Sequence, residues 1–382
     1  MSEPSSIFHL PSSQSPRVAI VCDWLTGIGG AERIVLELHR MFPEAPIYTS
    51  QYDPKAIDWF HDADVRTGWL QHLPVGLRKF LPILRARYFS HLNLSDYDLV
   101  ISSNFGAESK AVKFGPNTTH ICICNAPTHY YWSRYEQYVR EPGFGALNWL
   151  ARLSLRVLVG PLRRWDYKAA QKPTKMIAIS SHIQAQIKKY YGRESAVIHP
   201  PVDTARFQLP SSNFHLPARK GFVITGRQTP YKRIDLAVAA CSQLGLSLTV
   251  IGNGPEHAKL VKMADATITF VTDASDAQVA NYLAAAQAFI FPNLDDFGIA
   301  AVEALAAGTP VIAYHAGGAL DYVIEGKTGV FFNEQTVASL SQALQSFDPN
   351  QFDAKAITQS AQQFSPEHFT TSLRDIIHQT TS

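Results

Sequence analysis

The chain has 382 residues, of which 46% are hydrophobic and 17% charged, a composition that excludes a disordered protein and gives length enough for two domains. No apolar run reaches the roughly 18–20 residues that a membrane-spanning helix needs. The net charge is only +2, but residues 1–200 hold 23 Lys and Arg against 16 Asp and Glu, and the remainder holds 11 against 16, which predicts two units with different partners.

The four cysteines follow neither a zinc-site nor a disulfide spacing; they are Cys22, Cys122, Cys124 and Cys241. Residues 1–16 lack the cationic start and the apolar stretch of a secretory signal. We therefore expect reduced cysteines and a cytoplasmic location.

The first predicted elements are a strand at Arg17–Cys22, a glycine-rich turn and a helix at Ala31–Met41, which open a doubly wound parallel sheet. Further elements of this half are expected as strands at Asp98–Ser102, His120–Cys124, Met176–Ile179 and Ala196–Ile198 and as a long helical segment at Leu147–Lys172.

The paired prolines of His199–Asp203 interrupt this alternation, because proline continues neither a strand nor a helix. A second alternation follows, with strands expected at Gly221–Thr225, Ser247–Ile251, Thr267–Phe270, Ala288–Phe291 and Pro310–Ala313, and helices at Ile234–Cys241, Asp276–Ala286, Ala300–Ala307 and Pro366–His378. We predict two Rossmann-like αβα domains, at residues 1–202 and 203–365. The pattern does not show which domain the last helix packs on.

The most informative segment is Asp295–Gly308, which places Asp295 and Glu303 eight positions apart. Ala300–Ala307 favours a helix that Gly308 ends, so Asp295 precedes the helix and Glu303 lies in its early turns. The first backbone N–H groups of this helix would face the same space. Carboxylates beside amide donors suit a ligand with hydroxyls and phosphates, such as a nucleotide sugar, although an ordinary acidic helix cap shows the same pattern.

Basic and glycine-rich loops follow two strands of the second domain. Gly226-Arg227 and Tyr231-Lys232-Arg233 lie between a strand and a helix, where two cations would neutralise a diphosphate; a solvated basic loop is the alternative. The turn Gly252-Asn253-Gly254 follows the next strand, and its glycines would let the backbone approach a nucleobase or would form a plain turn.

Two loops of the first domain also suit a ligand. Gly29-Gly30 enters a helix and could hold a phosphate on its amides or form a sharp bend, and it does not fit the G-x-G-x-x-G fingerprint. Cys122–Tyr138 is dense in aromatic and polar side chains, which can stack on sugar rings and select hydroxyls. A surface loop whose aromatics pack beneath it is the alternative.

In their order along residues 17–380, these segments resemble the family-4 retaining glycosyltransferases of the GT-B fold. DDFGIAAVEALAAG and GRQTPYKRIDLAV resemble the carboxylate pair and the Gly-Arg…Lys-Arg element of that family, and CICNAPTHYYWSRYEQY resembles the His-x-Pro-x-Arg-x-x-Trp element of its mannosyltransferase-like members. Pro127 and Trp132 match, whereas Asp295 replaces the usual Glu, Asn125 the usual His and His129 the usual Arg. Asn125 can donate a hydrogen bond but cannot titrate.

The resemblance implies two Rossmann-like αβα domains facing a cleft, with the C-terminal helix at 366–382 packing back on the first domain. It assigns the donor phosphates to Arg227 and Lys232, the transferred sugar to Asp295 and the ribose to Glu303. The other implied donor-binding positions are Gly29, Gly30, Gly226, Gly252, Asn253, Phe297, Gly298 and Ile299. The implied sugar or acceptor positions are Asn125, which we group with the catalytic residues, and His129, Tyr130 and Trp132.

The implied reaction is retaining transfer of a sugar, with GDP-mannose as the expected donor, to a lipid-linked or growing glycan in cell-surface polysaccharide synthesis. The donor's own phosphate would help to take the acceptor proton. No metal is expected, because the chain has no Asp-x-Asp element at a strand end and the cations would replace it. Two alternatives stay open: a nucleotide-sugar epimerase of the same fold, and a non-catalytic subunit that binds donor or glycan, suggested by the Asp295 and Asn125 departures.

The segment Arg66–Phe89 contains no acidic residue and interleaves basic side chains with Trp and aliphatic ones. Such a segment suits an anionic membrane interface, and we expect it to contact the inner membrane face; a cationic helix packed on the core is the alternative. Nucleic acid is not an expected partner, because no binding motif accompanies the basic stretch.

Overall fold

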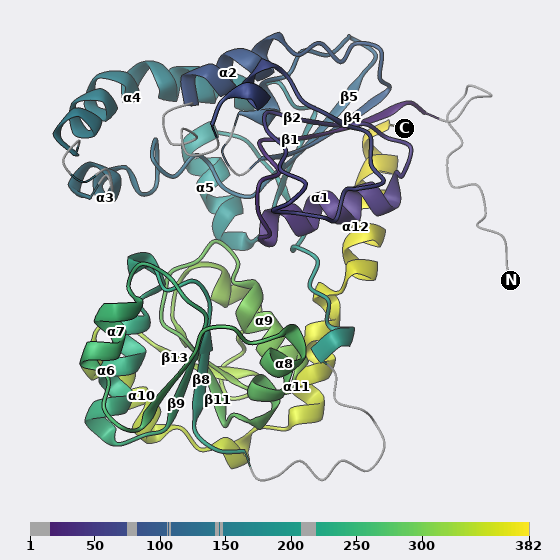
Figure 1. Cartoon of the computed structure of the whole chain (residues 1–382). Coiled ribbons are helices and arrows are strands. Elements are labelled where there is room, and N and C mark those ends of the chain that lie inside the picture. The colour runs from purple at the N-terminus through teal and green to yellow at the C-terminus, as the bar shows by residue number, and fades with distance from the viewer. Residues whose placement is uncertain are drawn as a thin grey trace, which may run out of the picture. The chain divides into compact units, whose positions relative to one another are not determined.

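The computed structural model describes residues 16–74, 82–104, 106, 108–141, 145, 148–207 and 219–381. This part of the chain forms two compact units, each a parallel sheet covered by helices (Figure 1). Unit 1 contains the described residues up to Ile179, Ile183–Ile198 and those from Thr370 onward, and unit 2 contains Ser180–His182 and His199–Phe369.

The change of unit between Ile198 and His199 lies four residues before the predicted boundary at 202. The His199 ring packs on Phe364 with a centroid distance of 5.1 Å, and the Val202 N–H donates to the Phe364 carbonyl at 2.8 Å. These contacts attach the proline-containing segment to unit 2.

The sheet of unit 1 has the strand order β3-β2-β1-β4-β5-β6-β7, with all neighbours parallel. Its strands are β1 (Val18–Cys22), β2 (Ile47–Thr49), β3 (Val65–Arg66), β4 (Leu99–Asn104), β5 (Thr119–Cys124), β6 (Lys175–Ala178) and β7 (Ala196–Val197). The helices in this part of the sequence are α1 (Gly30–Met41), α2 (Pro82–His91), α3 (Tyr135–Arg140), α4 (Asn148–Ala170) and α5 (Ser181–Tyr191).

The sheet of unit 2 has the order β10-β9-β8-β11-β12-β13, which is the order of a Rossmann sheet counted from β8. Its strands are β8 (Phe222–Thr225), β9 (Leu248–Ile251), β10 (Ile268–Val271), β11 (Ala288–Phe291), β12 (Val311–Tyr314) and β13 (Gly329–Phe332). The helices in this part of the sequence are α6 (Ile234–Leu244), α7 (His257–Met263), α8 (Asp276–Ala285), α9 (Ile299–Ala306), α10 (Val337–Ser346), α11 (Ala354–Ala361) and α12 (Pro366–Thr381). From Thr370 onward α12 belongs to unit 1, as the family resemblance implies for the C-terminal helix.

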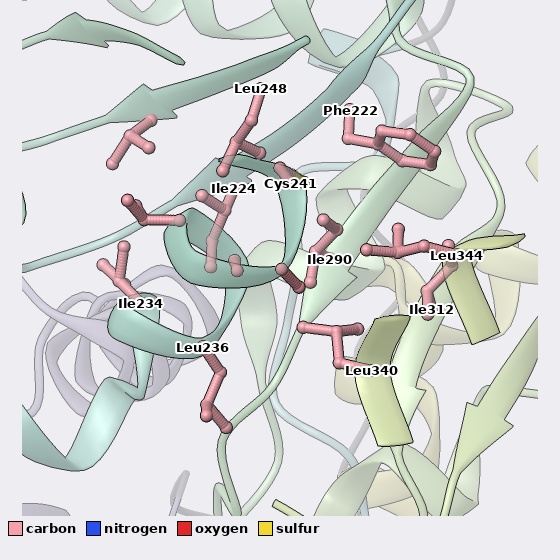
Figure 2. Close-up of a cluster of buried hydrophobic side chains, with 14 of the residues drawn as sticks. Phe222, Ile224, Ile234, Leu236, Cys241, Leu248, Ile290, Ile312, Leu340 and Leu344 are labelled. Carbon is pink, nitrogen blue, oxygen red and sulfur yellow. The ribbon is translucent and has the colours of Figure 1, made fainter. Parts of the chain in front are cut away.

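The core of unit 2 forms because its central strands are apolar on both faces, as strands covered by helices on both sides must be. Figure 2 shows Ile224, Ile290 and Ile312 of three strands packing with Cys241 of α6 and Leu340 of α10, all of them at most 3% exposed. Each fully buried aliphatic side chain of this size contributes about 1.5–3 kcal/mol. This layer holds β8 and β11 side by side.

The cysteines are buried and unbridged, as the sequence predicts. Cys122 and Cys124 lie with Ile121 and Ile123 in β5, and all four side chains have no exposed surface. Cys22 and Cys241 are also free thiols in buried positions.

Candidate functional site

The strand order of unit 2 reverses between β8 and β11. In open parallel sheets, ligands bind beyond the carboxyl ends of the strands at such a point, because the loops there diverge. The loop 226–233 leaves β8 and the loop 292–298 leaves β11. Arg227, Lys232 and Asp295 lie on these two loops, so the structure brings the main predicted residues of the second domain to one edge of its sheet.

Lys232 and Asp295 form an ion pair across this edge. The Lys232 Nζ lies 2.5 Å from the Asp295 Oδ2, and their side chains are 23% and 19% exposed. The Asn293 Nδ2 donates to the same oxygen at 3.2 Å. A cation predicted for phosphates and a carboxylate predicted for a sugar are thus direct neighbours. Arg227 is exposed on the loop of Lys232.

Gly298 shapes the entry into α9. It has φ of 102°, which favours glycine, and a Cβ at this position would lie 2.5 Å from both the Phe291 ring and the Tyr322 hydroxyl. The helix then begins at Ile299, one residue before the prediction, with no side-chain cap at Gly298. Uncapped helix N-termini present backbone N–H groups, the feature predicted for the donor phosphates.

The loop before α9 also packs against a 3₁₀ helix, Gly317–Asp321, that the sequence reasoning missed. The Gly318 N–H donates to the Asp295 carbonyl at 2.9 Å, and a Cβ on Gly318 would lie 2.3 Å from the Phe297 Cα. This close backbone contact fixes the height of Asp295 above the sheet. The signal in the sequence was the Gly317-Gly318 pair after β12.

The side chain of Phe297 anchors the loop and is only 3% exposed. It stacks on His199 at a centroid distance of 5.3 Å and makes edge contacts with Tyr322 and Phe364. Burial raises the pKa of the Tyr322 hydroxyl well above its ordinary value, and the Asp295 carboxylate adds to this rise. Only the backbone of Phe297 is therefore placed for the predicted donor contact.

Glu303 lies in the second turn of α9 and is 9% exposed. Its position relative to Asp295 follows the predicted spacing, and a largely buried carboxylate at a helix start requires polar partners. Its contact with the ribose stays a prediction.

The glycines of the predicted base-binding turn pack closely against the loop that follows β8. A Cβ on Gly252 would lie 2.3 Å from the Gly226 carbonyl oxygen, and one on Gly254 would lie 2.5 Å from that of Gln228. The Gln228 N–H donates to the Asn253 carbonyl at 2.9 Å. The glycines therefore let the turn after β9 lie against the loop after β8, and a contact of this turn with a nucleobase stays a prediction.

Gln228 joins these two loops, and the sequence analysis does not include it among the candidate site residues. Its side chain is fully buried, its Nε2 donates to the Gly252 carbonyl at 2.7 Å, and its Oε1 lies 2.8 Å from the His257 Nδ1. Gln228 thereby fixes the backbone of the loop next to Arg227.

The predicted residues of the first domain lie at the carboxyl ends of β1 and β5. Gly29 precedes α1 in extended conformation with φ of −159°, and Gly30 is the first residue of that helix. Asn125 is 8% exposed, and its Nδ2 donates to the Ser103 hydroxyl and the Asn104 carbonyl, both at 3.1 Å. The amide nitrogen of Asn125 thus binds within unit 1.

The aromatic residues after β5 also use their polar atoms within unit 1. The Tyr130 hydroxyl donates to Glu108 at 3.3 Å, and the Trp132 Nε1 donates to Asp166 at 2.7 Å. The Trp132 ring stacks on Tyr190 at 5.2 Å, while the His129 Nδ1 lies 2.8 Å from the Ser133 hydroxyl. The packed-loop alternative accounts for these contacts, and an acceptor contact by His129, Tyr130 or Trp132 stays a prediction.

Beneath these aromatics lies an ionic network that sequence reasoning did not find. Arg85 pairs with Glu108 at 3.0 Å, and Lys110 pairs with Asp166 at 2.6 Å, with all four side chains at most 6% exposed. Asp166 also accepts from the Tyr191 hydroxyl at 2.8 Å. Paired charges are the form in which buried ions are tolerated.

Arg85 does not take part in the membrane contact predicted for Arg66–Phe89. Its guanidinium is buried against Glu108 and lies over the Trp24 ring at 4.9 Å, so it does not face a membrane. Arg66 pairs with Asp64 at 2.7 Å. Residues 75–81 of this segment lie outside the described residues. For Arg85 the core-packing alternative is the correct one.

The stability of unit 1 is expected to fall as pH rises from about 5 to 7. Burial raises the pKa of Glu108 from 4.5 to about 7, although the Arg85 charge opposes this rise. The folded state therefore binds this proton more tightly than the unfolded state does, and the advantage, about 3 kcal/mol at most, is lost as the carboxyl ionises. Urea unfolding at several pH values measures it. Glu108→Gln should flatten the profile, and parallel profiles for the two proteins would contradict the assignment.

Solved structures define the fold class of this two-unit arrangement. A sucrose-phosphate synthase from Thermosynechococcus elongatus gives a TM-score of 0.69 at 20% identity, covering 96% of this chain and 99% of that one. HepE from Anabaena, in complex with UDP and glucose, gives 0.67 at 16% identity, covering 95% and 100%. At these identities the likeness concerns the fold, which is GT-B.

The family follows from two family models. Glycosyltransferase Family 4 matches residues 28–206, and Glycosyl transferases group 1 matches residues 209–364. Together they span most of the chain, which belongs to the family-4 glycosyltransferases with the GT-B fold.

Curated relatives match a shorter stretch. A D-inositol 3-phosphate glycosyltransferase from Streptomyces avermitilis is 28% identical over 205 residues, covering 45% of this chain and 44% of that protein. A glycogen synthase from Mycobacterium tuberculosis is 30% identical over 186 residues, with the same two coverages of 45% and 44%. The chain thus matches less than half of the length of these relatives.

Proposed function

We propose that the protein is an active hexosyltransferase that moves a sugar from a nucleoside diphosphate to a hydroxyl acceptor and retains the anomeric configuration. The main support is the 2.5 Å contact of Lys232 with Asp295 at the strand reversal of unit 2. A cation for a diphosphate beside a carboxylate for sugar hydroxyls matches the charge pattern of a nucleotide sugar.

The ion pair suggests how the donor enters. The diphosphate competes with Asp295 for Lys232, and the exchange frees the carboxylate to accept a hydrogen bond from a sugar hydroxyl. Arg227 adds a second cation from the same loop. The partly buried charges of Lys232 and Asp295 thus change partners without being left unpaired, which limits the cost of binding.

In the transfer step the bond between the anomeric carbon and the phosphate oxygen breaks, and the acceptor oxygen bonds to that carbon on the same face. The acceptor proton passes to the departing phosphate. Arg227, Lys232 and the start of α9 stabilise the charge that develops on the diphosphate, and such preorganised electrostatics often dominates catalysis. No metal takes part, so EDTA should leave the rate unchanged.

GDP-mannose is the first donor to test, since the motif resemblance implies it, and a lipid-linked or growing glycan is the expected acceptor. Two solved structures of similar fold suggest further donors to test beside GDP-mannose. HepE was crystallised in complex with UDP-glucose, and WaaB is a lipopolysaccharide outer core galactosyltransferase. UDP-glucose and UDP-galactose therefore belong in the same panel.

A thermal-shift panel of these nucleotide sugars tests donor binding. The matching donor should raise Tm, because a ligand at about 100 times its Kd stabilises the folded state by about 2.7 kcal/mol. Lys232→Ala should lose most of the shift. If no nucleotide sugar or nucleoside diphosphate shifts the wild type, the donor site is wrong.

The products formed from a labelled donor then distinguish a transferase, an epimerase and a non-catalytic subunit. An acceptor extract should receive label from the wild type. An epimer formed from donor alone would indicate an epimerase, and donor binding without product in any extract would indicate a non-catalytic subunit.

A further inference from the structure

Helix α4 carries an apolar stripe that is not covered in unit 1. Trp149 is 64% exposed, Leu150 46%, Leu153 53% and Val157 64%. At the helical periodicity these four positions fall within an arc of about 100°, so they form one continuous face. An exposed apolar face of this kind on a folded unit marks an interaction surface. We call it the α4 stripe.

The C-terminal part of α4 fixes the helix to unit 1. Its buried residues, Asp166, Ala169 and Ala170, all lie after Pro161, and Asp166 holds the Lys110 ammonium at 2.6 Å. The α4 stripe lies entirely before Pro161, where Figure 1 shows α4 with α3 extending away from the sheet of unit 1. The stripe is therefore presented on a supported, projecting helix.

The charge around the α4 stripe is mainly positive. Residues 142–165 contain four arginines and no Asp or Glu. Arg152 binds α3, donating to the Val139 carbonyl at 3.0 Å and to the Arg140 carbonyl at 2.9 Å. Arg156 and Arg164 are exposed on the same helix. Over residues 134–168, seven basic side chains stand against three acidic ones.

This combination favours a lipid surface over a second copy of the chain. A symmetric dimer through the α4 stripe would bring the arginines of two copies together, because both partners present the same patch. An anionic bilayer instead supplies phosphate groups to the arginines and an apolar boundary to Trp149, Leu153 and Val157. No helix in the described part of the chain is long and apolar enough to cross a membrane.

We propose that α4 lies in the interface of an anionic membrane, with Trp149, Leu150, Leu153 and Val157 inserted among the acyl chains and Arg156 and Arg164 at the phosphates. This surface is distinct from the segment Arg66–Phe89, whose Arg85 is buried. The membrane proposal does not depend on which donor the protein uses, because no residue of the candidate site in either unit belongs to the α4 stripe.

Vesicle co-flotation of the full chain tests this proposal. The protein should float with vesicles containing phosphatidylglycerol and much less with neutral phosphatidylcholine vesicles, and binding should weaken as salt rises. The variant Trp149→Ser/Leu153→Ser/Val157→Ser should bind at least about tenfold more weakly. Arg156→Gln/Arg164→Gln should lose at least about tenfold on anionic vesicles alone, since each cation contributes on the order of 1 kcal/mol.

The matched control is Val261→Ser/Met263→Ser/Tyr282→Ser, which removes three exposed apolar side chains from unit 2 and should leave flotation unchanged. Light scattering of each protein reports its oligomeric state. Equal flotation of the wild type and the α4 variant, or a wild-type dimer that the α4 variant makes monomeric without vesicle binding, would overturn the proposal. If the Tm of the α4 variant equals that of the wild type, its weaker vesicle binding does not result from unfolding.

Discussion

Alanine at Lys232 is expected to lower the rate of sugar transfer by about 10²–10³-fold, and alanine at Arg227 by a similar factor. Lys232 lies 2.5 Å from Asp295 and is 23% exposed, so its ammonium can move to an entering diphosphate. In the proposed mechanism, removing it takes away one of the two cations that stabilise the leaving-group charge. Transfer kinetics with the donor found in the thermal-shift panel measure both losses.

Lys259→Ala is the matched control, because Lys259 is also ion-paired in unit 2, at 2.7 Å from Glu256, but is 66% exposed on α7. It should retain the wild-type rate. Lys232→Arg should recover part of the activity, since it keeps the charge but changes its shape. Free energies of unfolding should differ by no more than about 1 kcal/mol among these variants. Full transfer by both Arg227→Ala and Lys232→Ala would refute the mechanism.

The largest effect on stability is expected from Lys110→Met, which should destabilise the protein by about 3–5 kcal/mol. Lys110 and Asp166 have no exposed side-chain surface and lie 2.6 Å apart. Burial lowers the pKa of Lys110, but the Asp166 carboxylate outweighs this and leaves the pKa raised. Without the ammonium, the buried Asp166 carboxylate keeps its hydrogen bonds from Trp132 and Tyr191 but loses its counter-charge. Urea unfolding followed by tryptophan fluorescence measures the loss.

Lys188→Met is the control, since Lys188 pairs with Glu194 where both side chains are more than half exposed, at 61% and 80%. It should change stability by less than about 1 kcal/mol. Lys110→Met/Asp166→Asn should recover part of the loss, because the uncompensated charge is gone. A Lys110→Met protein as stable as the control would show that the pair contributes little.

Local pattern is sufficient to predict the three longest helices, α1, α4 and α12, and the start of the site. Ala300–Ala307 was expected as a helix ended by Gly308, and α9 spans Ile299–Ala306 with Gly308 at φ of 72°. Strong helix formers and a left-handed glycine are local signals. The short strands β2 and β3 are not predicted from the sequence, because two or three residues give too little periodicity, and β13, with four residues, is not predicted either.

The contacts that build the site depend on the folded chain. Lys232 and Asp295 are 63 positions apart, and motif order placed them in one site without showing that they pair. The Lys110–Asp166 pair spans 56 positions and has no local signal. The sequence predicts a turn at Gly252, but only the fold shows that the backbone at Gly226 lies against it.

Both units reverse their strand order at one point, yet they use that point differently. In unit 1 the Asp23 carboxylate follows β1 and accepts hydrogen bonds from the backbone N–H groups of Gly106 at 2.6 Å and Ser109 at 2.7 Å. Those amides hold a carboxyl group of the chain itself, in the manner in which comparable amides elsewhere hold a phosphate. Repetition of the architecture therefore did not repeat the arrangement of charges: unit 1 places its own Asp23 carboxylate against these amides, whereas in unit 2 our proposal assigns the amides at the start of α9 to the phosphates of a donor.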